Sequence, residues 1–139
     1  MERVVTIGEK EYRLSSNAYT PIAYKQQFGQ DYFSEMFSMF KNNEKLMGML
    51  LNSQSEELEA SQMDVSMLAD FDMTFFHRLF WVYHKSANPQ AEPFDKFFMN
   101  MDYFPFAEVA PVLMEILNQG MTTRKKSMNP LAPVMKSLQ

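Results

Sequence analysis

The segment that ends at Ala87 constrains the fold most, because it predicts a helix that is apolar over more than half of its circumference. Asp70 or Asp72 is expected to begin this helix, and Asn88-Pro89 is expected to end it. A helix with two apolar sides must be covered on both, so we expect it to lie at the centre of the fold. The two apolar rows are Phe71, Phe75, Leu79 and Val82 in one, and Phe76, Phe80 and Tyr83 in the other.

Shorter elements are expected on either side of this segment. Residues 3–14 alternate in polarity around a turn at Gly8-Glu9-Lys10, which predicts a β-hairpin. A first helix follows, with Ser16 or Asn17 as its cap, Pro21 in its first turn and Gly29 at its end.

A second helix is expected to begin at the capping residue Asp31. Its predicted apolar stripe consists of Tyr32, Phe33, Met36, Phe37 and Phe40, extended by Met47, Leu50 and Leu51. Residues 52–66 are polar and weakly patterned, which predicts a loop.

Two more helices are expected after the central one. The first runs from Phe94 to about Met101, and the second opens at Pro105 and ends at Gly120. Pro111 lies inside the second pattern, so we expect it to kink the helix or start it afresh. The side chains expected to face inward are Val109, Val112, Leu113, Ile116 and Leu117.

Charge divides the chain into a body and a tail. The length of 139 residues fits one domain, and residues 1–120 hold all 17 acids but only nine bases. Residues 121–139 hold four bases and no acid. We therefore expect a mainly α fold: one small bundle of about five helices with an N-terminal hairpin, then a flexible basic tail. The tail is either a frayed terminus or an interaction arm or fusion point.

Composition excludes several function classes. The chain has no cysteine, so disulfides, thiolate metal sites and a cysteine nucleophile are excluded. Its four glycines lie too far apart for a phosphate-binding loop, and the net charge of −4 argues against nucleic-acid binding. No run approaches the roughly 20 apolar residues of a membrane span, so we expect a soluble intracellular protein.

The titratable residues do not form a catalytic pattern. His77 and His84 lie seven residues apart, about 10.5 Å along a helix, which is too far for one metal ion. With Asp70 they are expected to form a polar stripe on the exposed side. Asp70 and Asp72 fit the helix N-terminus, and neither has a partner in sequence that would shift its pKa. We expect no enzyme activity, no metal and no cofactor.

Large apolar side chains are unusually frequent. The chain holds 14 Met, 13 Phe, six Tyr and one Trp, more than five short helices can readily bury. Core packing explains many of them. Methionine-rich surfaces also adapt to varied apolar partners, so the surplus favours a protein that holds an apolar helical partner.

The order of segments resembles the tail assembly chaperones of long-tailed bacteriophages and prophages of Gram-positive type. The resemblance covers residues 3 to about 128 as a joint pattern of order and spacing. The segments that carry it are Ile7 to Leu14, Tyr24 to Gly29, Phe80 to Pro89, Pro93 to Phe98, and Leu117 to Lys126. The chain departs from the family pattern in its long 52–66 segment and its methionine content.

This resemblance implies a role without catalysis. Such proteins coat the apolar tape measure protein in the host cytoplasm, help the tail tube to polymerise, and are absent from the finished virion. Many also occur as a frameshifted longer product whose extension recruits the tail tube protein, and Arg124, Lys125 and Lys126 lie where such a shift would fall. Many copies along one partner would favour weak self-association. The candidate partner contacts are Phe76, Phe80, Trp81, Tyr83, Met36 and Met47, and the alternative for each is core packing.

One alternative belongs to another class. A small helical adaptor, such as a head–tail connector or a tail completion protein, would stay in the particle. The two readings therefore differ in whether purified virions contain this chain.

Overall fold

The computed structural model of the chain describes residues 2–44, 48 and 72–122. The described part is mainly helical, with a two-stranded antiparallel hairpin at its N-terminus, which confirms the predicted fold class. Its elements are β1 (Glu2–Ile7), β2 (Lys10–Ser15), α1 (Thr20–Phe28), α2 (Tyr32–Asn42), α5 (Thr74–Ala87), α6 (Phe94–Met99) and α7 (Phe106–Thr122).

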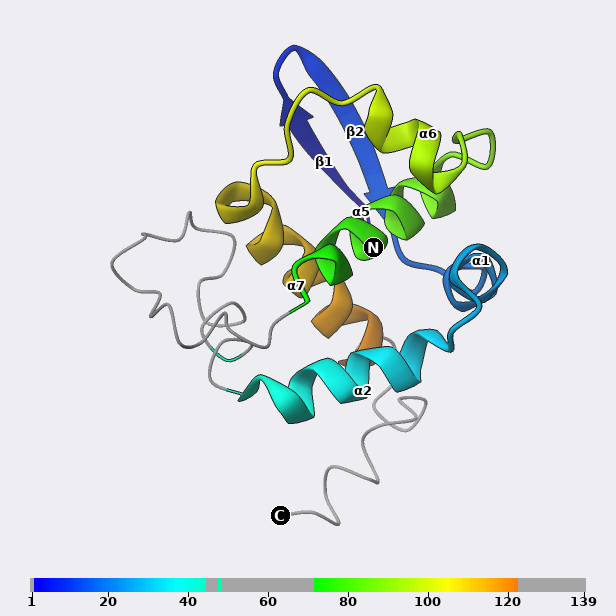
Figure 1. Cartoon of the computed structure of the whole chain (residues 1–139), viewed down its shortest axis with the longest axis vertical. Helices are drawn as coiled ribbons and strands as arrows, with labels where there is room; N and C mark the ends of the chain where they lie inside the picture. The colour runs from blue at the N-terminus through cyan, green and yellow to red at the C-terminus, as the bar shows by residue number, and fades with distance from the viewer. Residues whose placement is uncertain (1, 45–47, 49–71, 123–139) are drawn as a thin grey trace.

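Helix α5 is the centre of the molecule, as its two apolar rows predict. Strand β2, α1, α6 and α7 all contact it, and Figure 1 shows these elements around it. The helix begins at Thr74, two residues after the predicted start at Asp72, whose Oδ1 accepts a hydrogen bond from the Thr74 backbone N–H at 3.0 Å in the preceding turn. Asn88 follows the last turn, as predicted, whereas Phe71 and Asp70 lie outside the described residues. The buried side chains of α5 are Phe75, Phe76, Leu79, Phe80, Trp81, Val82 and Tyr83.

The hairpin places one face of the sheet on α5. Its register pairs Ile7 with Lys10, so Gly8 and Glu9 form a two-residue turn. Gly8 has φ 66°, a conformation that glycine adopts without the strain of a Cβ atom. The alternation of strand side chains then buries Ile7, Tyr12 and Leu14.

Helices α1 and α2 begin and end for local reasons. Gly29 ends α1 with φ 72°, and its N–H donates to the Lys25 carbonyl at 2.8 Å. Asp31 caps α2 by accepting from the Ser34 N–H at 2.8 Å, as predicted. The predicted cap of α1 is wrong: the helix starts at Thr20, and Asn17 instead accepts from the Tyr19 N–H in the preceding turn.

The inward face of α2 differs from the predicted stripe. Tyr32, Met36 and Met39 are buried, whereas Phe37 is 45% exposed. The spacing from Tyr32 to Met36 and Met39 is one helical face, and Phe37 lies a residue beyond it. Tyr32 also meets the centre of the fold, because its hydroxyl lies 2.6 Å from that of Tyr83 in α5. The predicted extension at Met47, Leu50 and Leu51 and the predicted loop at 52–66 lie outside the described residues.

Helix α7 continues through Pro111. The prediction that this proline starts the helix afresh is wrong, since α7 is one element that begins at Phe106. A proline there removes one backbone hydrogen bond, and burial of Val109 and Leu113 on either side holds the helix together. Helix α6 ends at Met99 and α7 ends at Thr122, which shifts both predicted ends by two residues.

Candidate functional site

The four aromatic candidates on α5 are core residues. Phe76, Phe80 and Tyr83 are completely buried, and Trp81 is 3% exposed. The hairpin, α1, α6 and α7 all contact α5, and this burial favours the core-packing alternative given for each residue; their role as partner contacts stays a prediction. Met36, 2% exposed, is a core residue for the same reason. The described residues do not include Met47, Arg124, Lys125 or Lys126.

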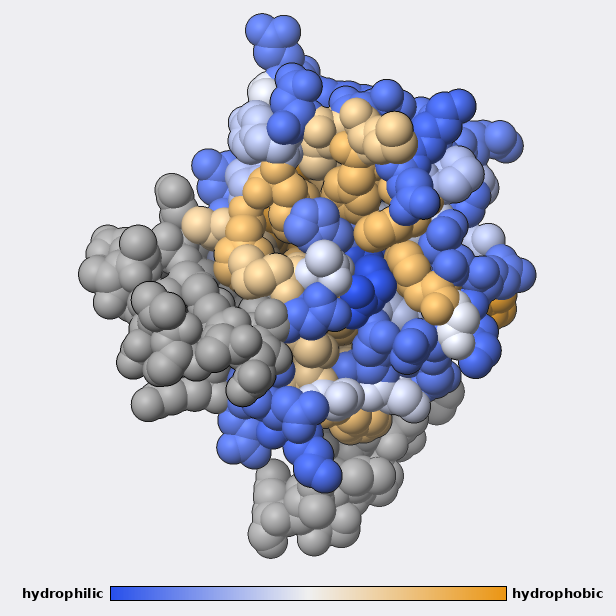
Figure 2. Space-filling model, in the orientation of Figure 1, coloured by the Kyte–Doolittle hydropathy of each residue, from blue (hydrophilic) through white to orange (hydrophobic). Residues whose placement is uncertain are grey.

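An apolar groove lies beside these residues, between α5, α6 and the end of α1. It has a volume of about 710 Å³. Figure 2 shows apolar residues gathered on this face of the molecule, broken by a few polar ones. The groove is lined by Phe28, Thr74, His77, Arg78, Phe94, Asp95, Phe98 and Met99.

Aromatic edge-to-face contacts shape the walls of this groove. The ring centroids of Phe28 and Phe94 lie 5.1 Å apart, and those of Phe94 and Phe98 lie 5.1 Å apart. Met99 stands at the mouth with 83% of its surface exposed, the largest exposure among the large apolar side chains of the described residues. The groove therefore combines fixed aromatic walls with one flexible side chain, which suits an apolar ligand of variable shape.

Sequence reasoning missed this groove although the signal was present. Phe94 and Phe98 lie four residues apart in α6, which places both on one helical face. Neither is fully buried in the fold, so that face is only partly covered. The contribution of Phe28 could not be found in the same way, because Phe28 meets Phe94 only through the packing of α1 beside α6.

Arg78 forms the polar floor of the groove and connects three parts of the chain. Its Nε donates to Glu35 of α2 at 2.9 Å and to the Tyr24 hydroxyl of α1 at 3.1 Å, and its Nη2 donates to Asp72 at 2.9 Å. The Tyr24 hydroxyl in turn donates to Glu35. The carboxylates of Glu35 and Asp72 thus balance the charge of Arg78. The floor of the groove therefore has no unpaired positive charge that could bind an anionic ligand.

This network shifts the pKa values of its members. Burial raises the pKa of Tyr24, and the hydrogen bond to the Glu35 carboxylate raises it further. The pKa of Asp72 lies below its ordinary value: burial opposes this shift, but hydrogen bonds from Thr74 and Arg78 outweigh it. The prediction that Asp72 has no basic partner is wrong, because Arg78 lies six residues away in sequence and reaches back past the first turn of α5.

Both histidines lie among aromatic rings, which corrects the predicted exposed stripe. The His77 ring centroid lies 4.2 Å from that of Phe104 and 5.1 Å from that of Phe98. The His84 ring lies 5.0 Å from that of Phe97. Burial lowers the pKa of both histidines, so at neutral pH they are uncharged members of the packing between α5 and α6.

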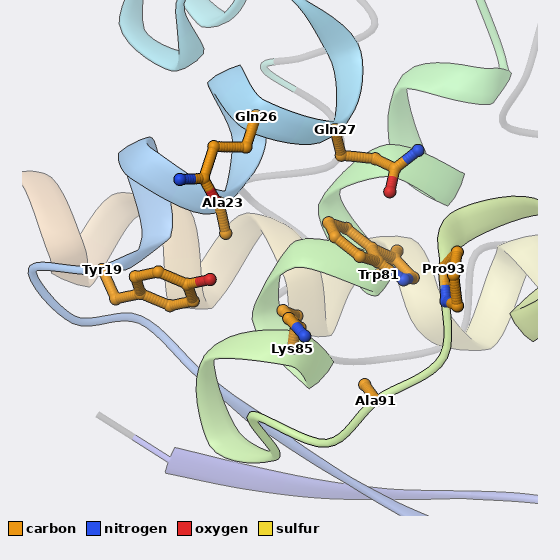
Figure 3. A pocket seen from close by; sticks show the side chains of 8 residues that line it. All are labelled: Tyr19, Ala23, Gln26, Gln27, Trp81, Lys85, Ala91 and Pro93. Atoms are coloured by element: carbon orange, nitrogen blue, oxygen red, sulfur yellow. The ribbon is translucent and has the colours of Figure 1, made fainter.

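A second, smaller pocket is lined by Trp81 and residues of α1. It measures about 240 Å³, and Figure 3 shows Tyr19, Gln26, Gln27, Trp81 and Lys85 around it. Its strongest donors are already engaged, because Trp81 Nε1 donates to the Glu92 carbonyl at 2.8 Å and Lys85 Nζ to the Pro89 carbonyl at 2.6 Å. The donors of Trp81 and Lys85 are therefore not free to bind a ligand, and the apolar groove is the stronger candidate site.

The described residues contain no cluster of three or more His, Cys, Asp or Glu residues that could hold a metal ion. Within the same ranges, no helix is both long and apolar enough to cross a membrane.

Comparison of the chain with protein-family profiles, curated proteins and solved structures finds no match.

Proposed function

We propose that this protein is a tail assembly chaperone that binds apolar helical segments of the tape measure protein and keeps that protein soluble during tail assembly. The observation that supports the proposal is the apolar groove between α5, α6 and the end of α1. The sequence resemblance to tail assembly chaperones supports it independently, since it rests on the order of segments and not on the groove.

The chemistry of the groove fits an apolar helix better than a charged or small ligand. Its walls are the rings of Phe28, Phe94 and Phe98, and the Arg78 charge below them is balanced within the protein. Apolar side chains that project from one face of a helix can fill such a groove, and its volume exceeds that of any single side chain. Met99 would adapt to different segments of a long partner.

The same proposal extends to the biological setting. Several copies would bind along one tape measure protein in the host cytoplasm and leave before the virion is complete. A frameshifted extension after Arg124, Lys125 and Lys126 would recruit the tail tube protein.

Co-expression with the tape measure protein tests the function. This chain is expected to convert an insoluble partner into a soluble complex that holds several copies of the chain, with the mass measured by light scattering. A partner that stays insoluble and copurifies with nothing would contradict the proposal. Detection of this chain in purified virions would then support the structural adaptor.

Substitution of Met99 tests the groove. Met99→Gln replaces an exposed apolar side chain with a polar one of similar length, so the fold should keep its stability. Partner affinity is expected to fall about tenfold, which corresponds to the loss of one buried apolar contact. Ile22→Gln is the matched control, because Ile22 is 53% exposed on α1 and does not line the groove. Equal affinities for the two variants would place the binding surface elsewhere.

A further inference from the structure

The two edges of the hairpin sheet are in different environments. On the outer edge of β2, the Arg13 carbonyl oxygen lies 3.1 Å from His84 Nδ1 and 3.4 Å from Asn88 Nδ2, so α5 covers this edge. On the outer edge of β1, the backbone of Glu2–Ile7 makes no hydrogen bond to any described residue outside the hairpin. A strand edge of this kind is able to pair with another strand.

The register fixes which backbone groups point outward from β1. Ile7 and Lys10 flank a two-residue turn and therefore form a hydrogen-bonded pair. Because such pairs alternate along an antiparallel ladder, the N–H and C=O groups of Glu2, Val4 and Thr6 point away from β2. Arg13 stands opposite Val4, and its carbonyl does point to the far edge, toward α5, as this alternation requires.

The free edge lacks most of the features that usually prevent pairing. Strand β1 has no proline, no lysine and no bulge, since its six residues pair one to one with β2. Val4 is 55% exposed in the middle of the strand, on the face opposite the core. The one inner charge of β1, Arg3, is paired with Glu115 of α7 at 2.5 Å.

Charge favours a second hairpin as the partner of this edge. The chain carries a net charge of −4, whereas residues 2–15 hold three acids and three bases and are neutral. In an antiparallel pairing centred on Val4, each Val4 faces the other, and Glu2 faces Thr6. No two like charges stand directly opposite in this register, and every outward N–H and C=O of Glu2, Val4 and Thr6 gains a partner.

We propose that β1 pairs with β1 of a second copy of this chain, antiparallel and centred on Val4, to form a four-stranded sheet across a dimer. The proposal goes beyond the proposed function, because it uses none of the residues that line the groove. A dimer of this kind would present two grooves to one long partner, and this would strengthen binding through effective concentration.

Sedimentation equilibrium of the purified chain alone tests the pairing. The average mass is expected to rise from monomer to dimer as protein concentration increases. Val4→Pro removes one outward N–H but none of the hairpin's own ladder bonds, and it is expected to weaken the dimer at least about tenfold. Val4→Thr keeps the N–H and the β-branched shape, so it should dimerise like the wild type. A monomer at all concentrations would overturn the proposal.

A second pair of variants covers the case in which Val4→Pro disrupts the hairpin. Val4→Lys keeps the backbone but places two like charges opposite each other, so it should also abolish the dimer. Because the chain has no cysteine, Val4→Cys introduces a single thiol, and oxidation should give a covalent dimer. Glu9→Cys, in the exposed turn, is the control and should cross-link much less. Equal cross-linking at the two positions, or a Val4→Lys variant that dimerises like the wild type, would overturn the pairing.

Discussion

The Nδ1 atom of His84 lies 3.1 Å from the carbonyl oxygen of Arg13, which joins the last turns of α5 to strand β2. Since a carbonyl can only accept, the contact selects the histidine tautomer with its proton on Nδ1. The same ring packs against Tyr12 at 5.6 Å and Phe97 at 5.0 Å between centroids. One uncharged histidine therefore connects the hairpin, α5 and α6.

Stability is expected to fall as pH falls from about 7 to about 5. Burial lowers the pKa of both His77 and His84, so the unfolded chain takes up protons at a higher pH than the folded chain does. The stabilisation is complete above the ordinary histidine pKa of about 6.5 and is lost as pH drops toward the folded values, with a slope of at most about 1.4 kcal/mol per pH unit for each histidine.

Urea denaturation at several pH values measures this dependence. The window lies above the range in which Asp and Glu titrate, which separates the histidines from the carboxylates. A His77→Gln/His84→Gln variant removes both groups and should show a smaller slope, even though its stability is lower at every pH. A wild-type stability that stays constant or increases on acidification would contradict the lowered pKa values.

Removal of the Arg78 side chain is expected to destabilise the fold by about 3 kcal/mol. Arg78→Ala leaves Glu35, whose side chain is 17% exposed, without its cation, and an unpaired buried charge is costly. Arg13→Ala is the matched control, because the Arg13–Glu2 pair is about half exposed on both sides. Its loss should cost less than about 1 kcal/mol. Similar losses in urea denaturation for the two variants would show that the Arg78 network contributes no more than a surface pair.

The sequence predicts the elements of this fold better than it predicts the contacts between them. Apolar periodicity found α5 and its burial, and turn and cap residues such as Gly29 and Asp31 placed the ends of α1 and α2. These features depend on neighbours within one or two turns of chain. The Arg78 network could not be found in the same way, because Glu35 lies 43 residues before Arg78 in sequence and only the packing of α2 beside α5 brings them together.

For the candidate site too, the sequence could not show how the elements pack against one another. An aromatic row at helical spacing can be core or binding surface, and the choice depends on how many elements cover the helix. The hairpin, α1, α6 and α7 cover α5, so Trp81 is buried. Phe94 and Phe98 of α6 are only partly buried. The sequence pointed to aromatic residues of α5, whereas the aromatic residues that stay partly uncovered beside the groove lie on α6.

Trp81 is expected to stabilise the fold and not to contact a partner. Its side chain packs against Phe28 at 5.6 Å between centroids, and Trp81→Ala should cost about 3–5 kcal/mol in the free energy of unfolding. Ile22→Ala, at an exposed position, should cost less than about 0.5 kcal/mol. Circular dichroism in urea measures both, since Trp81 is the only tryptophan and its fluorescence is lost in the variant. A Trp81→Ala protein of normal stability that no longer binds its partner would instead make Trp81 a contact residue.

Gly29→Ala is expected to destabilise the protein by about 1 kcal/mol. Gly29 ends α1 with φ 72°, and no heavy atom lies within 4 Å of a Cβ built there, so the cost is backbone strain and not a clash. Gly29→Asn should cost less, because asparagine tolerates the left-handed conformation. Gly48→Ala is the opposite control: Gly48 has helical backbone and no described heavy atom within 4 Å of a Cβ built there, so alanine should stabilise there by up to about 1 kcal/mol. Thermal denaturation of the three variants measures the order of their stabilities. A Gly29→Ala protein as stable as the wild type would show that α1 can end in another conformation.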